Sequence, residues 1–416
     1  MRILSCINTV RFWIARFLPP LERGGRGGWV AATVCSTPPS PPFSRGGGNS
    51  TNGIVSCIAC AASLVGAAWS QAGDTTRPPA IIERLKKDIA AAPLSMRYQG
   101  ATAEECRAWQ KTFAAQLKSL LGPHAPPAQW KSAVVSVKEF DDHRREELLL
   151  TAAGHPPLPI YLLHPKQGKG KRPAILAIHG HGSHGHHPVA GRDDLPGVEN
   201  AIKGANYDYG RQLVRHGYIV AVPCLTPFGE RLGKREAFGK QDPCADIFIR
   251  MQILGRTLMG ENLRDCLWAV ELLARQPGVD ADRIGCVGLS YGGRMTMLTA
   301  ALEPRIKVAV ISGTLNVMQE RTSRPYSCGA QIIPGLLRYG DVPEIASLIA
   351  PRHCLWEVGT RDTLIDATWA DEILLRQKRA YRSLGAEDRM SVDRFEGGHA
   401  WHGTVALKLL NNQLSK

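Results

Sequence analysis

The sequence has few cysteines and few aromatic residues for its length, and these shortages exclude several classes of protein. Eleven cysteines among 416 residues are far below the density of a disulfide-stapled scaffold, and no CxxC is paired with a second CxxC or an HxxxH to make a zinc module. Aromatic residues make up only 6% of the chain, while 44% is hydrophobic and 21% charged, as in ordinary globular proteins. Small stapled folds, zinc fingers and wholly disordered chains are therefore excluded.

Acidic residues are outnumbered, with 37 Asp and Glu against 51 Lys and Arg, which gives a formal net charge of +14. Residues 1–80 hold seven arginines against Glu22 and Asp74, so a charge of +5 lies in that segment. Net charge by itself bears on solubility and on steering of partners, and it does not identify one. We therefore expect no nucleic-acid partner.

Residues 1–78 are interpreted as a low-complexity leader that contains a signal-like segment. Its first part is rich in proline pairs and glycine runs, and such a stretch cannot bury enough surface to offset its chain entropy. An uncharged, mostly apolar run follows at Ile54–Trp69 and ends in small residues, which resembles the apolar region and cleavage site of a secretory signal. A lipoprotein signal ending at Cys57 is the alternative interpretation.

The apolar run is marginal in length for a bilayer span, and its flanks favour removal over permanent anchoring. We expect cleavage between Ala68 and Gly73, and therefore no stable membrane span in the mature protein. This predicts an exported protein, periplasmic or extracellular.

Residues 79–130 are predicted to form an N-terminal helical extension. Apolar residues recur at spacings of three and four, first from Ile81 to Ile89 and then from Trp109 to Leu121, which is the pattern of two amphipathic helices.

Residues 131–416 are predicted to form one doubly wound α/β domain around a mostly parallel sheet. Short β-rich runs at Val134–Phe140 and Arg145–Thr151, joined by a hairpin signal, come first, and the chain then alternates strands with helices. The expected strands are Ile160–Leu163, Ala174–Ile178, Tyr218–Val222, Arg283–Leu289, Val308–Ser312, Leu355–Val358 and Met390–Phe395, and the expected helices are Tyr207–Arg215, Asn262–Gln276, Gly292–Leu302, Thr368–Ser383 and Ala400–Asn411. Several of these strands are apolar throughout, which a parallel sheet covered on both faces requires.

Two stretches do not follow this alternation, Gly182–Ala205 and Thr314–Ile349. Both come where strand-to-helix loops would leave the carboxyl edge of the sheet. Loops at that edge shape ligand sites in α/β folds.

A candidate nucleophile lies in the run Gly288-Leu289-Ser290-Tyr291-Gly292-Gly293. A GxSxG pattern is weak evidence in a glycine-rich chain, but here a predicted buried strand precedes it and a predicted helix follows it. Ser290 then falls on the sharp strand-to-helix turn of a nucleophile elbow, which holds the hydroxyl out from the sheet edge. A glycine-rich turn with an ordinary serine is the alternative.

A serine hydroxyl needs a base oriented by a carboxylate, in the chain order Ser, Asp or Glu, His. His399 lies between the last predicted strand and the last helix, where that order places the base, while His402 is the competitor and would lie one turn into the helix. Asp362 follows the strand Leu355–Val358 and is favoured as the acid over Asp366, with helix capping as the structural alternative for both.

Acyl transfer also needs two N–H donors for the oxyanion. The residue after the nucleophile, Tyr291, supplies one, and the loop His179-Gly180-His181-Gly182 after the strand Ala174–Ile178 supplies the other, with the amide of His181 as the best candidate.

That loop continues to His184, His186 and His187, a cluster that invites a metal interpretation. Acidic residues nearby are limited to Asp193 and Asp194, the spacing matches no common zinc pattern, and a hydrolytic serine needs no metal. We therefore expect a polar rim to the site, with no metal and no cofactor.

From about Lys171 to His399 the chain resembles the dienelactone hydrolase and acetyl xylan esterase-like branch of the α/β-hydrolases. The segments that carry the resemblance, besides the elbow, are Phe228-Gly229-Glu230-Arg231, Asp280-Ala281-Asp282-Arg283-Ile284, Ile333-Pro334-Gly335-Leu336, Ile349-Ala350-Pro351-Arg352 and Glu396-Gly397-Gly398-His399, in that order. The resemblance implies an α/β-hydrolase fold, a triad of Ser290, Asp362 and His399, and an oxyanion hole from the amides of His181 and Tyr291. The nucleophile of dienelactone hydrolases proper is cysteine, so serine here favours carboxylic esters over lactones.

The cysteines beyond the predicted cleavage point fall into two groups. Cys266, Cys286 and Cys354 lie in helix or strand patterns and are expected to be small core residues. Cys224, Cys244 and Cys328 are predicted to lie in loops, where two of them could pair in an exported protein, although the connectivity stays open.

These patterns predict a serine carboxylic-ester hydrolase that acts through an acyl-enzyme, and the resemblance implies acetylated carbohydrates as its substrates. A serine peptidase of the prolyl-oligopeptidase kind is the alternative within enzymes, but residues 80–170 are too few for the large gating domain of that group. A non-catalytic binding protein on the same fold is the alternative outside enzymes.

Overall fold

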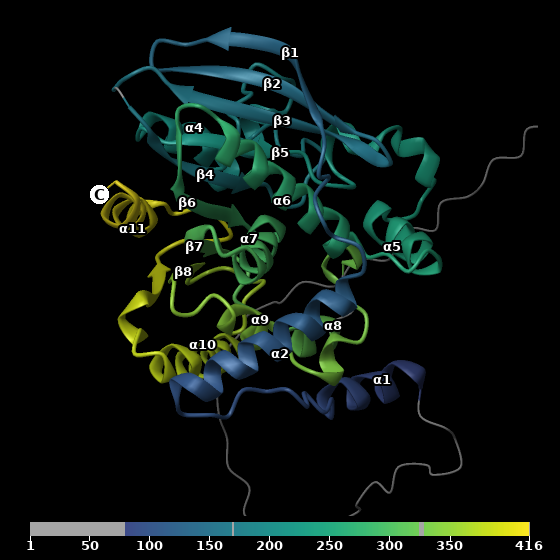
Figure 1. Ribbon diagram of the computed structural model, residues 1–416. Coiled ribbons are helices and arrows are strands. Elements are labelled where there is room, and N and C mark those ends of the chain that lie inside the picture. Colours follow the sequence, from purple (N-terminus) through teal and green to yellow (C-terminus); the bar gives the residue numbers. More distant parts are fainter. Residues whose placement is uncertain (1–79, 169, 324–327, 416) are drawn as a thin grey trace, which may run out of the picture. The chain divides into compact units, whose positions relative to one another are not determined.

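The computed structural model describes residues 80–168, 170–323 and 328–415 (Figure 1). The predicted leader, with its apolar run Ile54–Trp69 and its cleavage region, lies outside these residues. Among the helices that the structure does describe, none combines the length and the apolar character needed to cross a bilayer.

A nine-stranded, mostly parallel sheet organises the fold, as predicted, in the order β1-β2-β3-β5-β4-β6-β7-β8-β9. The strands are β1 (Lys131–Glu139), β2 (His143–Ala152), β3 (His155–Pro165), β4 (Arg172–Ile178), β5 (Ile219–Pro223), β6 (Val279–Leu289), β7 (Ile306–Ser312), β8 (His353–Gly359) and β9 (Met390–Phe395). The pairs β1·β2, β2·β3 and β3·β5 are antiparallel, and every other neighbouring pair is parallel.

The burial of the strands follows their composition. Residues Ala174–Ile178 of β4 and all of β5 are buried, because helices cover both faces of the parallel part and only apolar side chains fit there. β1 is exposed along its whole length at the antiparallel edge, where Phe140 donates its N–H to the carbonyl of His143 and closes the predicted hairpin.

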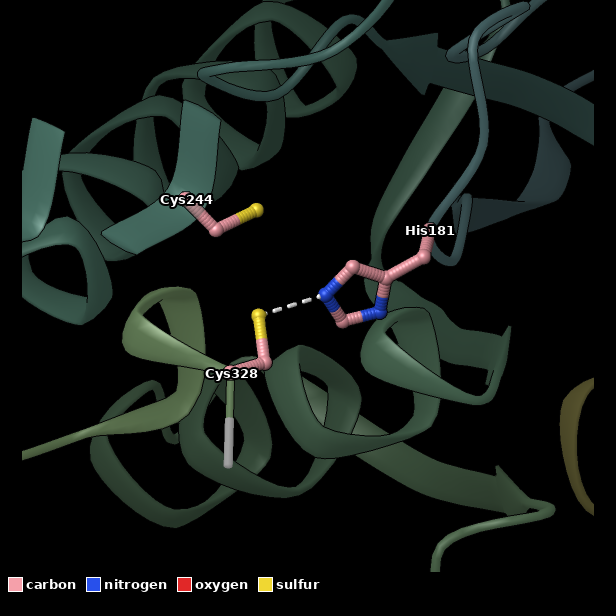
Figure 2. Close-up of side chains that lie close together, drawn as sticks. All are labelled: His181, Cys244 and Cys328. Atoms are coloured by element: carbon pink, nitrogen blue, oxygen red, sulfur yellow. Dashed lines mark hydrogen bonds between the residues drawn. The ribbon is translucent and has the colours of Figure 1, made fainter. Parts of the chain in front are cut away.

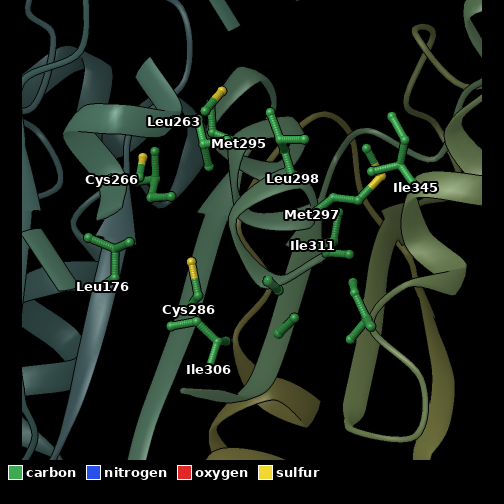
Figure 3. Close-up of a cluster of buried hydrophobic side chains, with 14 of the residues drawn as sticks. Leu176, Leu263, Cys266, Cys286, Met295, Met297, Leu298, Ile306, Ile311 and Ile345 are labelled. Carbon is green, nitrogen blue, oxygen red and sulfur yellow. The ribbon is translucent and has the colours of Figure 1, made fainter. Parts of the chain in front are cut away.

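Helices cover the sheet on both faces (Figure 1). One face packs against α4 (Tyr209–Arg215) and α11 (Thr404–Leu414), through one apolar cluster. The other packs against α6 (Leu258–Arg275), α7 (Tyr291–Leu302), α9 (Val342–Ser347) and α10 (Ala367–Ser383) through a second cluster. Figure 3 shows the centre of the second cluster, where Cys266 of α6 and Cys286 of β6 lie among leucine, isoleucine and methionine side chains, as predicted for core cysteines.

The two predicted N-terminal helices are α1 (Ile81–Ala90) and α2 (Ala103–Leu121). Thr102 and Glu105 form a capping box that fixes the start of α2. The apolar stripe of α2, which includes Phe113 and Leu117, is buried in the same cluster as the α6–α7 face, so this helix extends the core of the α/β unit.

The stretches predicted as loops contain short helices, which is a correction to the expected alternation. α3 (Val198–Ala205) lies in the first stretch, and α8 (Met318–Ser323), α9 and the 3-10 segments η3 (Gly329–Gln331) and η4 (Leu336–Arg338) lie in the second. Helices this short complete too few turns to give a periodic pattern. The remaining 3-10 segments are η1 (Gly229–Leu232), η2 (Arg235–Phe238) and η5 (Glu387–Arg389).

Two further helices differ from prediction. α5 (Pro243–Ile253) was not predicted, although Asp242 caps it and Pro243 occupies its first turn, both recognised start signals. α11 begins at Thr404 instead of Ala400, because Trp401 is buried and donates its N–H to the carbonyl of Ala205, which holds the chain out of the helix.

The strand order reverses at β4, since β5 lies on one side of it and β6 on the other. Ligands of open α/β sheets bind at the carboxyl ends of the strands that flank such a reversal. His179 is the first residue after β4, and Ser290 is the first residue after β6.

Candidate active site

Ser290 lies on a strained turn between β6 and α7. Its φ of 63° is in the left-handed region, which a residue with a side chain rarely adopts. Two residues on, a Cβ on Gly292 would lie 2.0 Å from the carbonyl oxygen of Ile178, so only glycine lets α7 begin this close to β4. Ser290 thus lies on the sharp strand-to-helix turn that its predicted strand and helix indicated, and it lines a cavity at the strand ends.

His399 and Asp362 form a hydrogen-bonded pair after the next strand ends. Asp362 follows β8 and His399 follows β9, and Oδ2 of the carboxylate lies 2.7 Å from Nδ1 of the imidazole. Asp362 is buried and also accepts the N–H of Leu364 at its other oxygen over 2.9 Å. The carboxylate therefore holds the tautomer with the proton on Nδ1 and leaves Nε2 as the basic nitrogen.

Two backbone hydrogen bonds tie the loop of Asp362 to the loop of His399. The N–H of Thr360 donates to the carbonyl of Phe395 over 2.9 Å, and that of Arg361 donates to Gly397 over 2.8 Å. A side-chain ion pair between Arg361 and Glu396 spans the same two loops. The two loops that carry His399 and Asp362 are thus held together by backbone hydrogen bonds.

The two competing residues have other partners. Asp366 is the N-cap of α10 and accepts the N–H groups of Thr368 and Trp369, the structural role that was the alternative for both aspartates. His402 lies before α11 and not one turn into it, with its Nδ1 2.6 Å from Asp393. His402 is not among the residues that line the cavity of Ser290, whereas His399 is.

The loop after β4 is held in place by His179. This imidazole is fully buried, and burial lowers its pKa to about 4, so it is neutral at ordinary pH. Its Nε2 accepts the N–H of Leu225 over 2.9 Å, and its Nδ1 therefore donates to the carbonyl of Gly180 over 2.7 Å. The tautomer of His179 is thus fixed by the loop that it anchors.

The amides of Gly180 and His181 in this loop differ in their hydrogen bonds. The N–H of Gly180 donates to the buried hydroxyl of Tyr207 over 2.5 Å. The amide of His181 donates to no other group within the described residues, and the amide of Tyr291 is at the first position of α7, where a helix offers no acceptor of its own. His181, Ser290 and His399 line one cavity.

The cavity has a volume of about 750 Å³, within the range of small-molecule sites. Several residues that line the cavity were not predicted from the sequence. Arg321 of α8, Gln331 of η3 and Cys328 come from the stretch predicted as a loop. Tyr207 and Leu364 also line the cavity. Only the position of that stretch, at the carboxyl edge of the sheet, signalled a role in the site.

Two of the three remaining histidines in this loop lie close together. His186 and His187 lie together with Glu230, with Nε2 of His187 3.5 Å from the carboxylate. Both ring nitrogens of the buried His186 are unsatisfied within the described residues. Burial lowers the pKa of both imidazoles, and neighbouring histidine and guanidinium groups lower it further, while the carboxylate of Glu147 raises that of His187. Both rings are therefore neutral at ordinary pH.

All seven cysteines within the described residues are free and buried. Cys224 and Cys328 lie outside regular helices and strands as predicted, whereas Cys244 lies in the first turn of α5 and was misplaced in the prediction.

Comparison with known proteins gives matches to hydrolases. The model of the dienelactone hydrolase family matches residues 193–325. YtaP of Bacillus subtilis strain 168, described as a hydrolase, is 33% identical over 291 residues, which cover 68% of this chain and 92% of that protein.

Among solved structures, a protein of Bacteroides fragilis described as an acetyl xylan esterase has a TM-score of 0.63 at 19% identity, covering 77% of this chain and 83% of that one. A glucuronoyl esterase of Solibacter usitatus has a TM-score of 0.55 at 16% identity, covering 74% and 92%. At such identities these structures share the fold.

Proposed function

The chain belongs to the dienelactone hydrolase family of α/β-hydrolases, and we propose that it is a serine carboxylesterase that works through an acyl-enzyme. The observation that carries this proposal is that two residues line the same cavity: Ser290, on its strained turn, and His399, whose imidazole is hydrogen-bonded to Asp362.

In the proposed reaction, Oγ of Ser290 attacks the ester carbonyl while Nε2 of His399 takes its proton. The imidazolium then gives that proton to the departing alkoxide, which leaves as the alcohol. A water molecule, deprotonated by His399 in turn, attacks the acyl-serine, and the imidazolium returns the proton to Oγ of Ser290 as the acid leaves. Asp362 keeps the imidazole in the required tautomer through its 2.7 Å hydrogen bond and stabilises the imidazolium.

The oxyanion of each tetrahedral intermediate is proposed to lie between the amides of His181 and Tyr291. Gly180 precedes His181 in the same loop, but its amide is occupied by Tyr207, so the next amide along the loop is the one that is available. The helix dipole of α7 adds to this effect, because its N-terminus points to the developing negative charge.

For the substrate, we propose an acyl ester of a carbohydrate, with acetyl as the acyl group. The names of the acetyl xylan and glucuronoyl esterases that share the fold support this class. Arg321 and Gln331 give the cavity side chains that can hydrogen-bond to sugar hydroxyls, while Leu289 and Leu364 give it apolar wall for the acyl group.

We also propose export of the mature protein after removal of the leader. The support for this is the composition of the run Ile54–Trp69 in the sequence.

A substrate panel tests the proposed activity. The purified protein is assayed with p-nitrophenyl acetate, butyrate and octanoate, with peptide anilides, and with acetylated xylan. Release of nitrophenol from the acetate and of acetic acid from xylan is the expected result. Turnover of anilides alone would identify a peptidase, and binding of esters without turnover would identify a non-catalytic protein; either result contradicts the proposal.

A further inference from the structure

Three side chains with metal-binding atoms converge beside the candidate active site (Figure 2). His181 comes from the loop after β4, Cys244 from the first turn of α5, and Cys328 from the residue before η3. Nε2 of His181 lies 2.8 Å from Sγ of Cys328, and the two sulfurs and this nitrogen all lie within 4.8 Å of one another. The three residues are far apart in sequence, so no spacing motif reveals them.

We propose that His181, Cys244 and Cys328 form a binding site for one thiophilic divalent cation of the zinc type. Two thiolates and one imidazole are a ligand set that zinc binds in proteins, and three protein ligands leave a fourth position open. The proposed site borders the cavity of Ser290, because both His181 and Cys328 also line that cavity. The ion lies beyond the proposed esterase mechanism, which needs no metal.

The ligands are held in place before an ion binds. His181 is exposed, but its ring packs against the rings of Phe228 and Tyr291, with centroids 5.2 and 5.1 Å away, and its Nε2 points to Cys328. On the other side, a Cβ on Gly329 would lie 2.6 Å from the carbonyl oxygen of Cys244. The backbone after Cys328 therefore lies directly against the first turn of α5, which keeps the two cysteines together.

The pKa values of the two thiols shift in opposite directions. Hydrogen bonds from Cys244 and His181 lower the pKa of the Cys328 thiol, whereas the hydrogen bond to Cys328 and burial raise that of the Cys244 thiol. Cys244 lies at the N-terminus of α5, whose dipole stabilises a negative charge once the proton has left.

Metal binding here would join three segments of the cavity wall. No disulfide joins the oxyanion loop, α5 and η3 within the described residues, and an ion held by all three resists their separation. We therefore expect the ion to raise the melting temperature. A disulfide between Cys244 and Cys328 is the competing chemistry, and it would remove both thiolates.

The test is a cobalt titration of the reduced, untagged full chain followed by absorption spectroscopy. Cys57 and Cys60 form a CxxC in the leader, so both are replaced by serine in every protein of the series. We expect one Co²⁺ per chain, with a thiolate-to-cobalt charge-transfer band and intense tetrahedral d–d bands. Added Zn²⁺ should displace the Co²⁺, and both kinds of band should then disappear. An octahedral spectrum, or no binding, would overturn the proposal.

Matched variants locate the site. Cys244→Ser and Cys328→Ser should each lose the charge-transfer band, whereas Cys106→Ala, at a buried cysteine of α2, should keep it. Ser290→Ala should also keep it, which separates this proposal from the proposed esterase activity. A band unchanged in both serine variants would contradict the assignment.

Two measurements on the parent chain do not depend on how the variants fold. X-ray absorption of the zinc-loaded protein should show two sulfur neighbours at about 2.3 Å and one nitrogen at about 2.0 Å. Mass spectrometry of protein from its own host should find Cys244 and Cys328 as free thiols. A disulfide between them would overturn the metal site.

Discussion

The carboxylate of Asp362 lies 2.7 Å from Nδ1 of His399, although 37 residues separate them in the sequence. The two residues follow the carboxyl ends of the neighbouring parallel strands β8 and β9. The pairing of these strands therefore sets the distance between acid and base, and the buried carboxylate directs the other imidazole nitrogen away from itself.

Replacing Ser290 with alanine should remove esterase activity by three or more orders of magnitude and leave the fold intact. Residual turnover would come only from substrate binding and the oxyanion hole. The rate is measured with p-nitrophenyl acetate, and circular dichroism serves as the folding control. A rate within about tenfold of the parent would show that Ser290 is not the nucleophile.

The two aspartates should respond differently to the same substitution. Asp362→Asn should lower turnover by roughly 10² to 10⁴, because an amide favours the wrong imidazole tautomer. Asp366→Asn is the matched control and should stay near the parent rate, since asparagine is also a good N-cap for α10. A larger loss in the Asp366 variant would mean that the wrong carboxylate has been chosen.

Stability should fall as the pH rises through the titration of Glu357. Burial raises the pKa of this carboxyl from 4.5 to about 7, against the effect of the hydrogen bond from the N–H of Gly403. Between these values the folded state binds more protons than the unfolded state, so the stabilisation is fully present below about pH 4.5 and is lost as the pH passes about 7. The loss is on the order of 3 kcal/mol.

Glu357→Gln is the control for this effect, because its side-chain carbonyl can still accept the N–H of Gly403 but does not titrate. Urea unfolding at pH 5 and pH 8 should show a clearly smaller difference for the variant than for the parent. Equal differences in the two proteins would refute the assignment to Glu357.

Ester hydrolysis should not depend on a metal held by His184, His186 and His187. Replacing the three together with asparagine or serine should leave turnover by the folded protein within about tenfold, and EDTA should not change the parent rate. Loss of turnover under both treatments, with recovery of the EDTA-treated parent in Zn²⁺, would instead identify a catalytic metal. His184→Asn alone is a useful comparison, since His186 and His187 also pack with Tyr161.

Protein isolated from its own host should begin between Trp69 and Thr76. N-terminal sequencing or mass spectrometry of the mature chain measures this. Cytosolic protein that still carries residues 1–60 would rule out the proposed export.

The sequence allowed the elbow at Ser290 and the positions of Asp362 and His399 to be predicted because each depends on local order. A residue that follows an apolar strand in a parallel sheet must lie at one edge, whatever the packing elsewhere. The same reasoning favoured Asp362 over Asp366 and His399 over His402 from their places along the chain. It could not show which side chain reaches across to the other loop.

Other features of the cavity depend on contacts between distant segments. The hydroxyl of Tyr207 occupies the amide of Gly180, and Cys244 meets Cys328 only because α5 packs on η3. α5 carried readable start signals at Asp242 and Pro243, but nothing local shows which loop a helix will touch.

The hydrogen bonds of Thr360 and Arg361 to the loop of His399 also bear on redesign of the protein. A graft that moved only Asp362 or only His399 to another scaffold would leave its loop without the backbone partners that fix it. The transferable part is the whole pair, residues 359–362 and 395–399, on two adjacent parallel strands. Substitutions aimed at new specificity are therefore better placed in α8, which borders the cavity through Arg321 and carries neither residue.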